Sequence, residues 1–370
     1  MLIYNSLFLI TLFLVALEVD NTRNPKLRIS PIEGSKIMNK QWIIVFLPLL
    51  LFAMLRTAVG DTPSYIDTFN AASSKFTLKD LDTRGFLFFG LMRFCKAFIF
   101  KDPQLWLMVL ALLALLPYVK ALKFFSCDVL MSVFLFFATA QFVYFFSGAR
   151  QMIAVAICFY AVRYLVEKKT WKYLLLVVLA MGFHVTAVVM LVLPLVVEIK
   201  PWSQRMWLLI VIAIVLIMAS ETLFENLGNL VLANTAYDRY VERALNQKGV
   251  TISRALVAVV PILLCFVYRG KQKALEDRTL NIFFNISMIN ACWMIAATGF
   301  GGDLTGRISE YFSTINVVLY PCIFQKLISD RIRKVMKACF VLGYGLFYIY
   351  QMYIAWGGLN YESKILKIFL

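Results

Sequence analysis

Apolar runs of about 15 to 20 residues recur along the whole 370-residue chain, separated by short basic segments. Each run is long enough to cross roughly 30 Å of hydrocarbon as a helix that rises about 1.5 Å per residue. Inside hydrocarbon the backbone must satisfy its own hydrogen bonds, which leaves helices and closed barrels. The sequence lacks the alternating strands, roughly ten residues each, of a membrane barrel. We therefore expect an all-α, polytopic transmembrane helical bundle.

Composition supports this class. Hydrophobic residues make up 61% of the chain and the mean hydropathy is +0.78, which is more apolar surface than a soluble core could bury. A net charge of +16 would suggest a nucleic-acid partner in a soluble protein. Here the basic residues gather in short loops between apolar runs, as the positive-inside rule describes. We therefore expect no nucleic-acid partner.

The basic segments also predict a topology with both termini outside. Six of them are assigned to the cytoplasmic side, namely 18–40, 119–127, 163–172, 200–206, 268–278 and 325–337. The predicted spans, about 11–12 in number, are 3–17, 41–58, 103–118, 128–147, 149–166, 172–182, 183–199, 206–220, 253–268, 279–298, 307–324 and 338–355.

Two assignments follow from the charge pattern. The segment 85–100, which contains Arg93 and Lys96, is predicted to be an interfacial helix that does not cross. The stretch 172–199 is predicted to be a broken hairpin whose two arms meet near His184, because one long helix would place the basic segment 268–278 outside.

We predict one integral membrane domain over residues 1–370. The extracytoplasmic loops 59–84 and 221–252 are too short to form a separate domain. The first apolar run has no basic residue before it and no small-residue cleavage site, unlike a secretory signal peptide. Met1 and Met38 both remain candidate start residues.

Seven cysteines lie in or beside apolar runs, and none shows CxxC spacing. This pattern is typical of small core residues rather than of metal or redox sites. We therefore expect neither a metal nor a cofactor.

Arg150 is the most conspicuous polar residue. It lies in YFFSGARQMIAVA, between two apolar segments and with no acidic residue nearby. An unpaired guanidinium at membrane depth is costly, so such an arginine predicts a functional site. The alternative is that its side chain extends to the lipid headgroups.

Further polar residues fall at the predicted extracytoplasmic face, which suggests a shared cavity; they are Arg56, Asp61, Tyr65, His184, Arg239 and Arg307. Each has a plainer reading. Arg239 has Asp238 beside it and fits a solvated helix face. His184 could be a hydrogen-bonded structural residue or a general acid or base. Asp61 could cap a turn before Pro63.

Several arginines at a membrane-edge cavity fit a lipid-linked phosphate or diphosphate, because guanidinium groups bind phosphate oxygens in pairs and stay charged. A nucleotide fits less well, since the glycine-rich GFGGD at 299–303 lacks both GxGxxG and Walker spacing. Aromatic residues near the site, Tyr65 among them, could stack on sugars or belong to the interfacial belt.

At these positions the sequence resembles the EpsG family of polysaccharide-polymerising membrane proteins, relatives of the Wzy O-antigen polymerases. The resemblance spans most of the chain. It rests on three runs, which comprise Arg56, Gly60, Asp61 and Tyr65; Gly148, Arg150, Gln151, Ile153 and Ala154; and Ala180, Phe183, His184, Thr186, Ala187 and Pro194. One departure concerns Arg84, which stands in TRGF where the family usually has an acidic residue. Its role is left open.

The resemblance implies a polymerase that joins polyprenyl-diphosphate-linked oligosaccharides at the extracytoplasmic face of the bacterial cytoplasmic (inner) membrane. Arg150, Arg307 and Arg56 would then bind the diphosphate, and His184 or Asp61 would deprotonate the acceptor hydroxyl. Tyr65, Gln151 and Arg239 are further candidate substrate-binding residues. A chain-length regulator and a flippase are possible protein partners.

Two other functions stay open. A flippase for lipid-linked oligosaccharides would share the helices and the arginines, but its charges should line a path to the cytoplasmic half and it often shows internal symmetry. The charges here gather at one predicted face, and no repeat is evident. A membrane acyltransferase would use a histidine with a second polar partner inside the membrane, and the sequence does not identify one.

Overall fold

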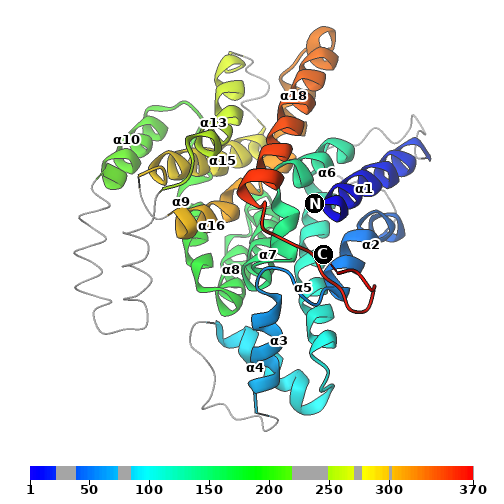
Figure 1. Ribbon diagram of the computed structural model, residues 1–370. Coiled ribbons are helices and arrows are strands. Elements are labelled where there is room, and N and C mark those ends of the chain that lie inside the picture. The colour runs from blue at the N-terminus through cyan, green and yellow to red at the C-terminus, as the bar shows by residue number, and fades with distance from the viewer. Residues whose placement is uncertain (22–38, 74–84, 219–248, 271–276, 300–301, 370) are drawn as a thin grey trace. The chain divides into compact units, whose positions relative to one another are not determined.

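The computed structural model describes residues 1–370 except 22–38, 74–84, 219–248, 271–276, 300–301 and 370. Every regular element among the described residues is a helix (Figure 1), which confirms the all-α prediction. The chain forms two compact units. Unit 1 comprises Met1–Leu191 and Ser329–Leu370, and unit 2 comprises Val192–Ile328.

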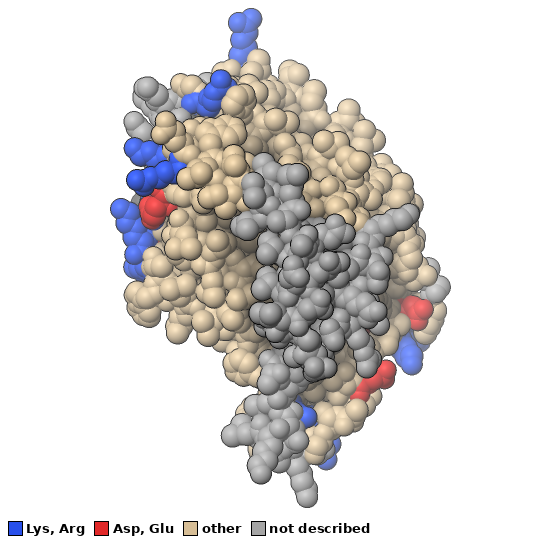
Figure 2. Space-filling view, turned by 90° about the vertical axis from the view of Figure 1, so that its left-hand side faces the viewer, with Lys and Arg blue, Asp and Glu red and all other residues tan. Residues whose placement is uncertain are grey.

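Four described helices are long and apolar enough to cross a membrane: α5 (Pro103–Phe125), α7 (Ala149–Val166), α15 (Arg278–Ala296) and α18 (Asp330–Tyr350), which continues as a π-helical turn to Ala355. Shorter apolar helices accompany them, among them α1 (Leu2–Asn21), α2 (Asn39–Leu55), α6 (Val129–Ala138), α8 (Thr170–Phe183) and α13 (Ile252–Val267). Most described side chains on the face drawn in Figure 2 are neither basic nor acidic. The protein is therefore a multi-pass membrane protein.

In unit 1, α7 packs against both α5 and α8, while α2 packs against α5 and α1. The interior is rich in aromatic side chains. Tyr118 of α5, for example, contacts the rings of Phe136, Phe145 and Phe159. Its hydroxyl donates to the buried amide oxygen of Gln141 at 2.8 Å. Close packing of this kind holds helices together where lipid tails are as apolar as the side chains.

The predicted span 128–147 is divided in the structure. α6 ends at Ala138, and Ala140 takes a left-handed conformation with φ +59°. The Thr139 hydroxyl donates to the Leu135 carbonyl at 2.8 Å, and this local bond competes with continuation of the helix. A short 3-10 helix, η4 (Gln141–Phe145), follows and leads the chain to the start of α7.

The predicted hairpin at 172–199 is confirmed. α8 ends at Phe183, and His184 has an extended backbone. The 3-10 helix η5 (Val185–Val192) then returns, so that the Tyr173 hydroxyl donates to the Met190 carbonyl at 2.7 Å. A continuous helix would separate these two residues by about 25 Å. The short helix α9 (Leu193–Val196) follows in unit 2.

Replacing Tyr173 by phenylalanine should loosen this hairpin. Both Tyr173 and Met190 are buried, so the variant leaves a carbonyl without a partner in an apolar interior. We expect a loss of about 1–3 kcal/mol in the free energy of unfolding. This loss of stability should appear as a lower thermal unfolding midpoint of the detergent-solubilised protein. An unchanged midpoint would mean that the bond does not hold the arms together.

Two short helices, α3 (Thr62–Ala71) and α4 (Phe86–Phe98), lie side by side in unit 1 (Figure 1). At 13 residues, α4 is about 20 Å long, too short to cross roughly 30 Å of hydrocarbon. Its Lys96 ammonium donates to the carbonyls of Phe69 at 2.6 Å and Asn70 at 2.8 Å, in the last turn of α3. The interfacial location of α4 itself stays a prediction.

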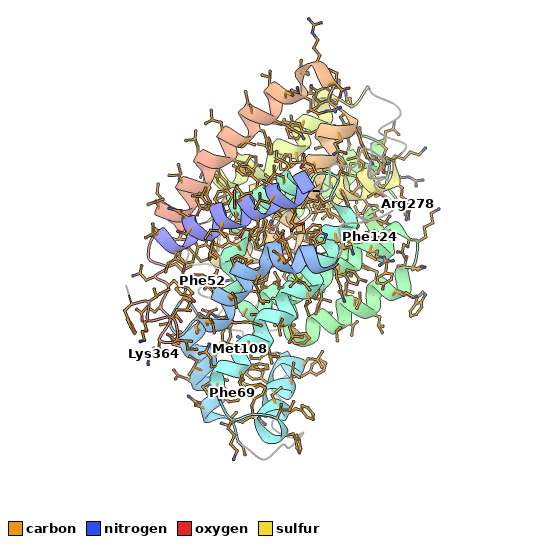
Figure 3. All side chains as sticks on the ribbon, turned by 90° about the vertical axis from the view of Figure 1, so that its right-hand side faces the viewer. Phe52, Phe69, Met108, Phe124, Arg278 and Lys364 are labelled. Carbon is orange, nitrogen blue, oxygen red and sulfur yellow. The ribbon has the colours of Figure 1, made fainter. Side chains whose placement is uncertain are left out.

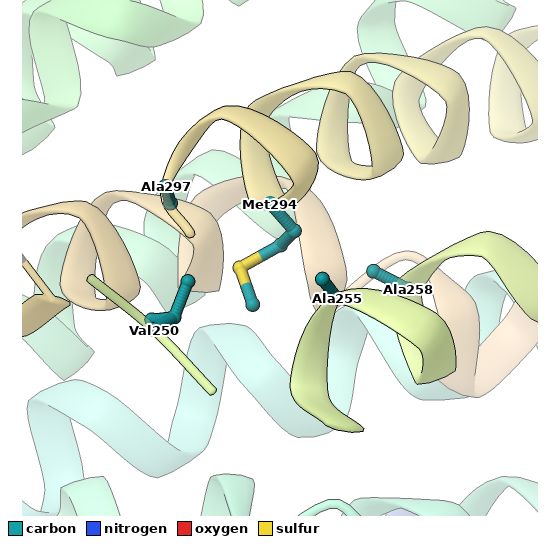
Figure 4. Close-up of a cluster of buried hydrophobic side chains, with 5 residues drawn as sticks. All are labelled: Val250, Ala255, Ala258, Met294 and Ala297. Carbon is teal, nitrogen blue, oxygen red and sulfur yellow. The ribbon is translucent and has the colours of Figure 1, made fainter. Parts of the chain in front are cut away.

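Unit 2 contains α10 (Gln204–Met218), α13, α15, α16 (Gly302–Ser313) and α17 (Asn316–Lys326). The predicted span 307–324 is therefore divided between α16 and α17. A small buried cluster joins α13 to the end of α15 (Figure 4) and consists of Val250, Ala255, Ala258, Met294 and Ala297. The buried Asn285 of α15 donates to the carbonyls of Val196 and Ile199, both at 2.9 Å, and so holds the end of α9.

Candidate active site

Arg56 follows the last residue of α2 and is 0% exposed. Its Nε donates to the Thr62 hydroxyl at 2.9 Å, and its Nη1 donates to the Ala53 carbonyl. The Thr62 hydroxyl in turn donates to the Phe146 carbonyl at 3.5 Å. Arg56 thus ties the end of α2 to the start of α3, and through Thr62 to the approach to α7. Its Nη2 has no hydrogen-bond partner among the described residues.

Two glycines bring these segments into contact. Gly60 has φ +49°, and a Cβ added to it would lie 2.4 Å from the Cβ of Ser147. Gly148, with φ +90°, is the residue before the first turn of α7. Only glycine adopts such backbone conformations without strain, and only glycine leaves room for this approach. The glycines of two separate sequence runs therefore serve one junction.

Arg150 lies in the first turn of α7 and is half-buried. Its backbone N–H donates to the Tyr65 hydroxyl at 3.4 Å. Its guanidinium carbon lies 5.4 Å from the ring centre of Phe88 and 5.6 Å from that of Phe89, in cation–π contact with both. No carboxylate within the described ranges pairs with Arg150 or with Arg56. The Arg150 side chain is thus held by α4.

The position of Arg150 raises the local positive charge. The first N–H groups of a helix carry about half a positive charge, and a cation beside them is disfavoured by about 0.3–1 kcal/mol. Arg150 occupies this place in α7, and the preceding Gly148 offers no side chain to cap the helix. An anion at this position would interact favourably with both the helix end and the guanidinium.

Tyr65 of α3 lies between these charges. Asp61, Arg150 and Arg56 all act electrostatically on its hydroxyl. Burial raises the pKa of Tyr65 above its ordinary value; Asp61 adds to this effect, and the two arginines oppose it. The hydroxyl therefore stays protonated at neutral pH. We call Arg56, Asp61, Tyr65 and Arg150 the arginine cluster.

Asp61 stands at the N-cap position of α3, yet its side chain makes no capping hydrogen bond to that helix. The plainer reading, in which Asp61 caps the turn, therefore has no support in the geometry. The carboxylate is half-buried and lies within electrostatic reach of Tyr65.

His184 occupies the corner between α8 and η5. Its Nδ1 and the Thr186 hydroxyl lie 2.5 Å apart, which fixes the orientation of the imidazole. The start of α4 packs beside this corner, since a Cβ on Gly85 would lie 3.2 Å from the Phe183 carbonyl. A Cβ on Gly182 would likewise meet Leu87 at 2.4 Å. α4 therefore contacts Arg150 through Phe88 and Phe89, and it contacts the His184 corner through Gly85 and Leu87.

The opposite end of α7 carries a basic turn. Arg163 and Lys169 both pair with Glu167, at 2.5 Å and 2.8 Å, and hydrogen bonds from Lys169 and Arg163 lower the pKa of this carboxyl. The 18 residues of α7 place about 27 Å between this turn and the arginine cluster. The two features therefore lie at opposite ends of one membrane-spanning helix.

The other predicted site residues are buried within a helix, belong to unit 2 or lie outside the described ranges. Gln151 follows Arg150 but is 2% exposed within α7. Arg307 is exposed on α16 in unit 2. Arg239 and Arg84 lie outside the described residues.

The sequence did not indicate two features of the structure, the aromatic contacts of Arg150 and the position of Arg254. Phe88 and Phe89 hold Arg150, although the sequence predicts only an interfacial helix for the apolar segment that contains them. Arg254 lies at the start of α13 and packs against Gly306 of α16. A Cβ added to Gly306 would lie 3.4 Å from the Arg254 Nη1. Arg254 is therefore near Arg307, the next residue in α16. Arg254 is the first basic residue after the loop 221–252, but this position alone does not indicate the partner helix.

Together these observations define a polytopic helical membrane protein in which two arginines without described acidic partners gather at helix ends. The sequence model of the EpsG family matches residues 39–363, and the chain belongs to this family. The family comprises Wzy-like polysaccharide polymerases, so the chain is a membrane protein of polysaccharide biosynthesis. Membership implies a lipid-linked oligosaccharide substrate. Neither a curated protein nor a solved structure matches the chain.

Proposed function

We propose that the chain polymerises polyprenyl-diphosphate-linked repeat-unit oligosaccharides by glycosyl transfer at the extracytoplasmic face of the bacterial inner membrane. The observation that carries the proposal is the arginine cluster. It places Arg150 at the N-terminus of α7 and the buried Arg56 near the same tyrosine, with no pairing carboxylate in the described part of the chain. Such a positive site suits a diphosphate.

Helix α7 supports the proposed sidedness of the reaction. Short basic loops are retained on the cytoplasmic side, and the basic turn at Glu167 lies at the end of α7 opposite to Arg150. The arginine cluster would then face outward. A substrate for this site would arrive after a flippase has moved it across the membrane, and a chain-length regulator would be a second partner.

In the proposed reaction a sugar hydroxyl of one lipid-linked unit attacks the anomeric carbon of the growing chain. A new carbon–oxygen bond forms, the bond from the anomeric carbon to the diphosphate oxygen breaks, and its electron pair leaves with the polyprenyl diphosphate. Negative charge develops on the diphosphate in the transition state. Fixed cations aimed at this charge supply the largest stabilising term in such reactions.

The arginines would divide this work. Arg150 is half-buried and can contact the diphosphate directly. Arg56 is fully buried, and its Nε and Nη1 already donate hydrogen bonds. It would therefore act on the diphosphate mainly through its positive charge, because charges interact strongly in a low-dielectric interior. Its Nη2 would be the donor that remains. Arg307 and its neighbour Arg254 are further candidate diphosphate ligands from unit 2. Arg239, Gln151 and Tyr65 remain candidates for binding the oligosaccharide.

The proton of the attacking hydroxyl would pass to His184 or to Asp61. His184 is of a residue type that commonly transfers protons in active sites, and its ring is oriented by Thr186. Asp61 has a carboxylate not used for capping α3. Asp61 begins α3, the His184 corner lies beside the start of α4, and α3 packs against α4.

The experiment is the formation of a polymer ladder by the purified protein in lipid discs from its own lipid-linked repeat unit. Wild-type protein should extend the chain, and His184→Ala should lower the rate about 100-fold if His184 is the base. Asp61→Asn is the matched variant, since it keeps shape and removes the charge. If Asp61→Asn is inactive while His184→Ala is active, the base is Asp61.

A flippase would behave differently in the same discs. Both leaflets are accessible there, so a flippase has nothing to transport and makes no ladder. Wild-type protein that yields no ladder in discs, yet moves the lipid-linked unit across the bilayer of closed vesicles, would establish transport and overturn the polymerase proposal.

A further inference from the structure

The C-terminal segment Leu359–Phe369 lies against the end of α2, close to the arginine cluster. Glu362 forms an isolated antiparallel bridge with Ala58: its N–H donates to the Ala58 carbonyl at 2.9 Å, and its carbonyl accepts from Thr57 at 2.8 Å. The Lys364 backbone N–H also donates to the Thr57 side-chain hydroxyl at 3.1 Å. Figure 3 labels Phe52 on α2 and Lys364 on this segment.

The last four carbonyls of α2 explain why the segment matters. A helix leaves its final four carbonyls without partners from its own backbone, and in an apolar surrounding each needs one from elsewhere. Here Ala53 accepts from Arg56, and Met54 accepts from the Gln104 amide at 2.5 Å. The C-terminal segment satisfies the other two. Phe52 accepts from the Tyr361 hydroxyl at 2.9 Å, and Leu55 accepts from the Ser363 hydroxyl at 2.5 Å.

Tyr361 is a built-in part of this junction. It is 0% exposed, and its ring lies 5.3 Å from that of Phe52 and 5.9 Å from that of Phe146. Burial raises the pKa of its hydroxyl to about 12, so the group remains a donor at neutral pH. Tyr361 and Arg56 also interact electrostatically. Tyr361 therefore contacts two segments that position Arg56: the end of α2, at Phe52, and the approach to α7, at Phe146.

We propose that Tyr361 and Ser363 are positioning residues of the polymerase, which fix the end of α2 and thereby the placement of Arg56 and Asp61. The expected effect of these residues on the polymerisation rate rests on the proposed function. The structural part of the inference, that the C-terminal segment orders residues 56–62, stands on the hydrogen bonds alone. Neither residue touches the substrate; both act through the backbone that carries Arg56.

Tyr361→Phe and Ser363→Ala should each lower kcat about tenfold with little change in KM, because a displaced charge loses transition-state stabilisation more than ground-state binding. Lys364→Ala is the matched control, since its side chain is exposed and only its backbone contacts Thr57. In an Arg56→Lys background, Tyr361→Phe should have much less effect, because residues that act through one another are not additive. Additive effects, or a Tyr361→Phe variant as active as wild type, would overturn the proposal.

Hydrogen exchange gives a readout that does not depend on activity. Tyr361→Phe should raise the exchange rate of backbone amides in 56–62 by about tenfold, while amides in the interior of α7 keep their wild-type rates. If wild-type protein proves inactive but exchange at 56–62 rises, the proposed function fails and the positioning role stands. Unchanged exchange at 56–62 in Tyr361→Phe would refute the positioning role whatever the activity.

Discussion

Arg150→Ala should lower the rate of polymer formation by at least about 100-fold, the loss expected when one fixed donor to a developing charge is removed. Arg150 is the half-buried cation of the arginine cluster, and its side chain contacts the rings of Phe88 and Phe89 rather than a described carboxylate. Its replacement should therefore cost little in folding and much in catalysis. The initial rate of ladder formation in lipid discs measures the effect.

Two variants make this test specific. Arg150→Lys keeps the charge but loses the paired donors of the guanidinium, so we expect an intermediate rate. Arg163→Ala removes the same side chain from the other end of α7, where Arg163 pairs with Glu167, and it should leave polymerisation close to wild type. An Arg150→Ala variant that is folded and fully active would contradict the proposed role of the cluster.

Gly60→Ala should be strongly destabilising as well as inactive. The new Cβ would lie 2.4 Å from the Ser147 Cβ, and φ +49° is unfavourable for any residue with a side chain. Overpacking and backbone strain together should cost about 3 kcal/mol. The thermal unfolding midpoint of the purified protein should fall, and polymer formation should be lost, because the displaced segment carries Arg56 and Asp61.

The chain offers a matched control and a rescue for Gly60→Ala. Gly343→Ala in α18 adds the same methyl group where nothing lies within 4 Å, so its unfolding midpoint should not fall. Ser147→Gly removes the atoms that the new methyl group would meet, and combined with Gly60→Ala it should recover part of the lost stability. Equal midpoints for Gly60→Ala and Gly343→Ala would show that the junction tolerates displacement.

Much of the fold could be predicted from hydropathy and charge. The prediction for α7 agrees with the structure at both ends. The charge pattern also predicts the break at His184, because one long helix would place the basic segment 268–278 outside. Hydropathy could not locate the breaks inside apolar runs. The left-handed Ala140 lies in a run that remains apolar across the break, so only local backbone geometry distinguishes it from a continuous helix.

Part of the candidate site could also be predicted from the sequence, namely its polar residues. Arg56, Asp61, Tyr65 and Arg150 stand out as polar residues near apolar runs, and the structure places all four in unit 1 around α3. The supporting residues carry no such signal. Tyr361 comes about 300 residues after Arg56, in a segment whose pairing with α2 depends on long-range backbone hydrogen bonds. Phe88 looks like any other apolar residue until its ring is seen beside Arg150.

The most direct test of the central claim is to count polyprenyl diphosphate released for each glycosidic linkage formed by the purified protein in lipid discs. Glycosyl transfer from a lipid-linked donor predicts one molecule released per linkage, with both quantities lost together in Arg150→Ala. Linkage formation without release of polyprenyl diphosphate, or no linkage at all from the intact lipid-linked unit, would contradict the account.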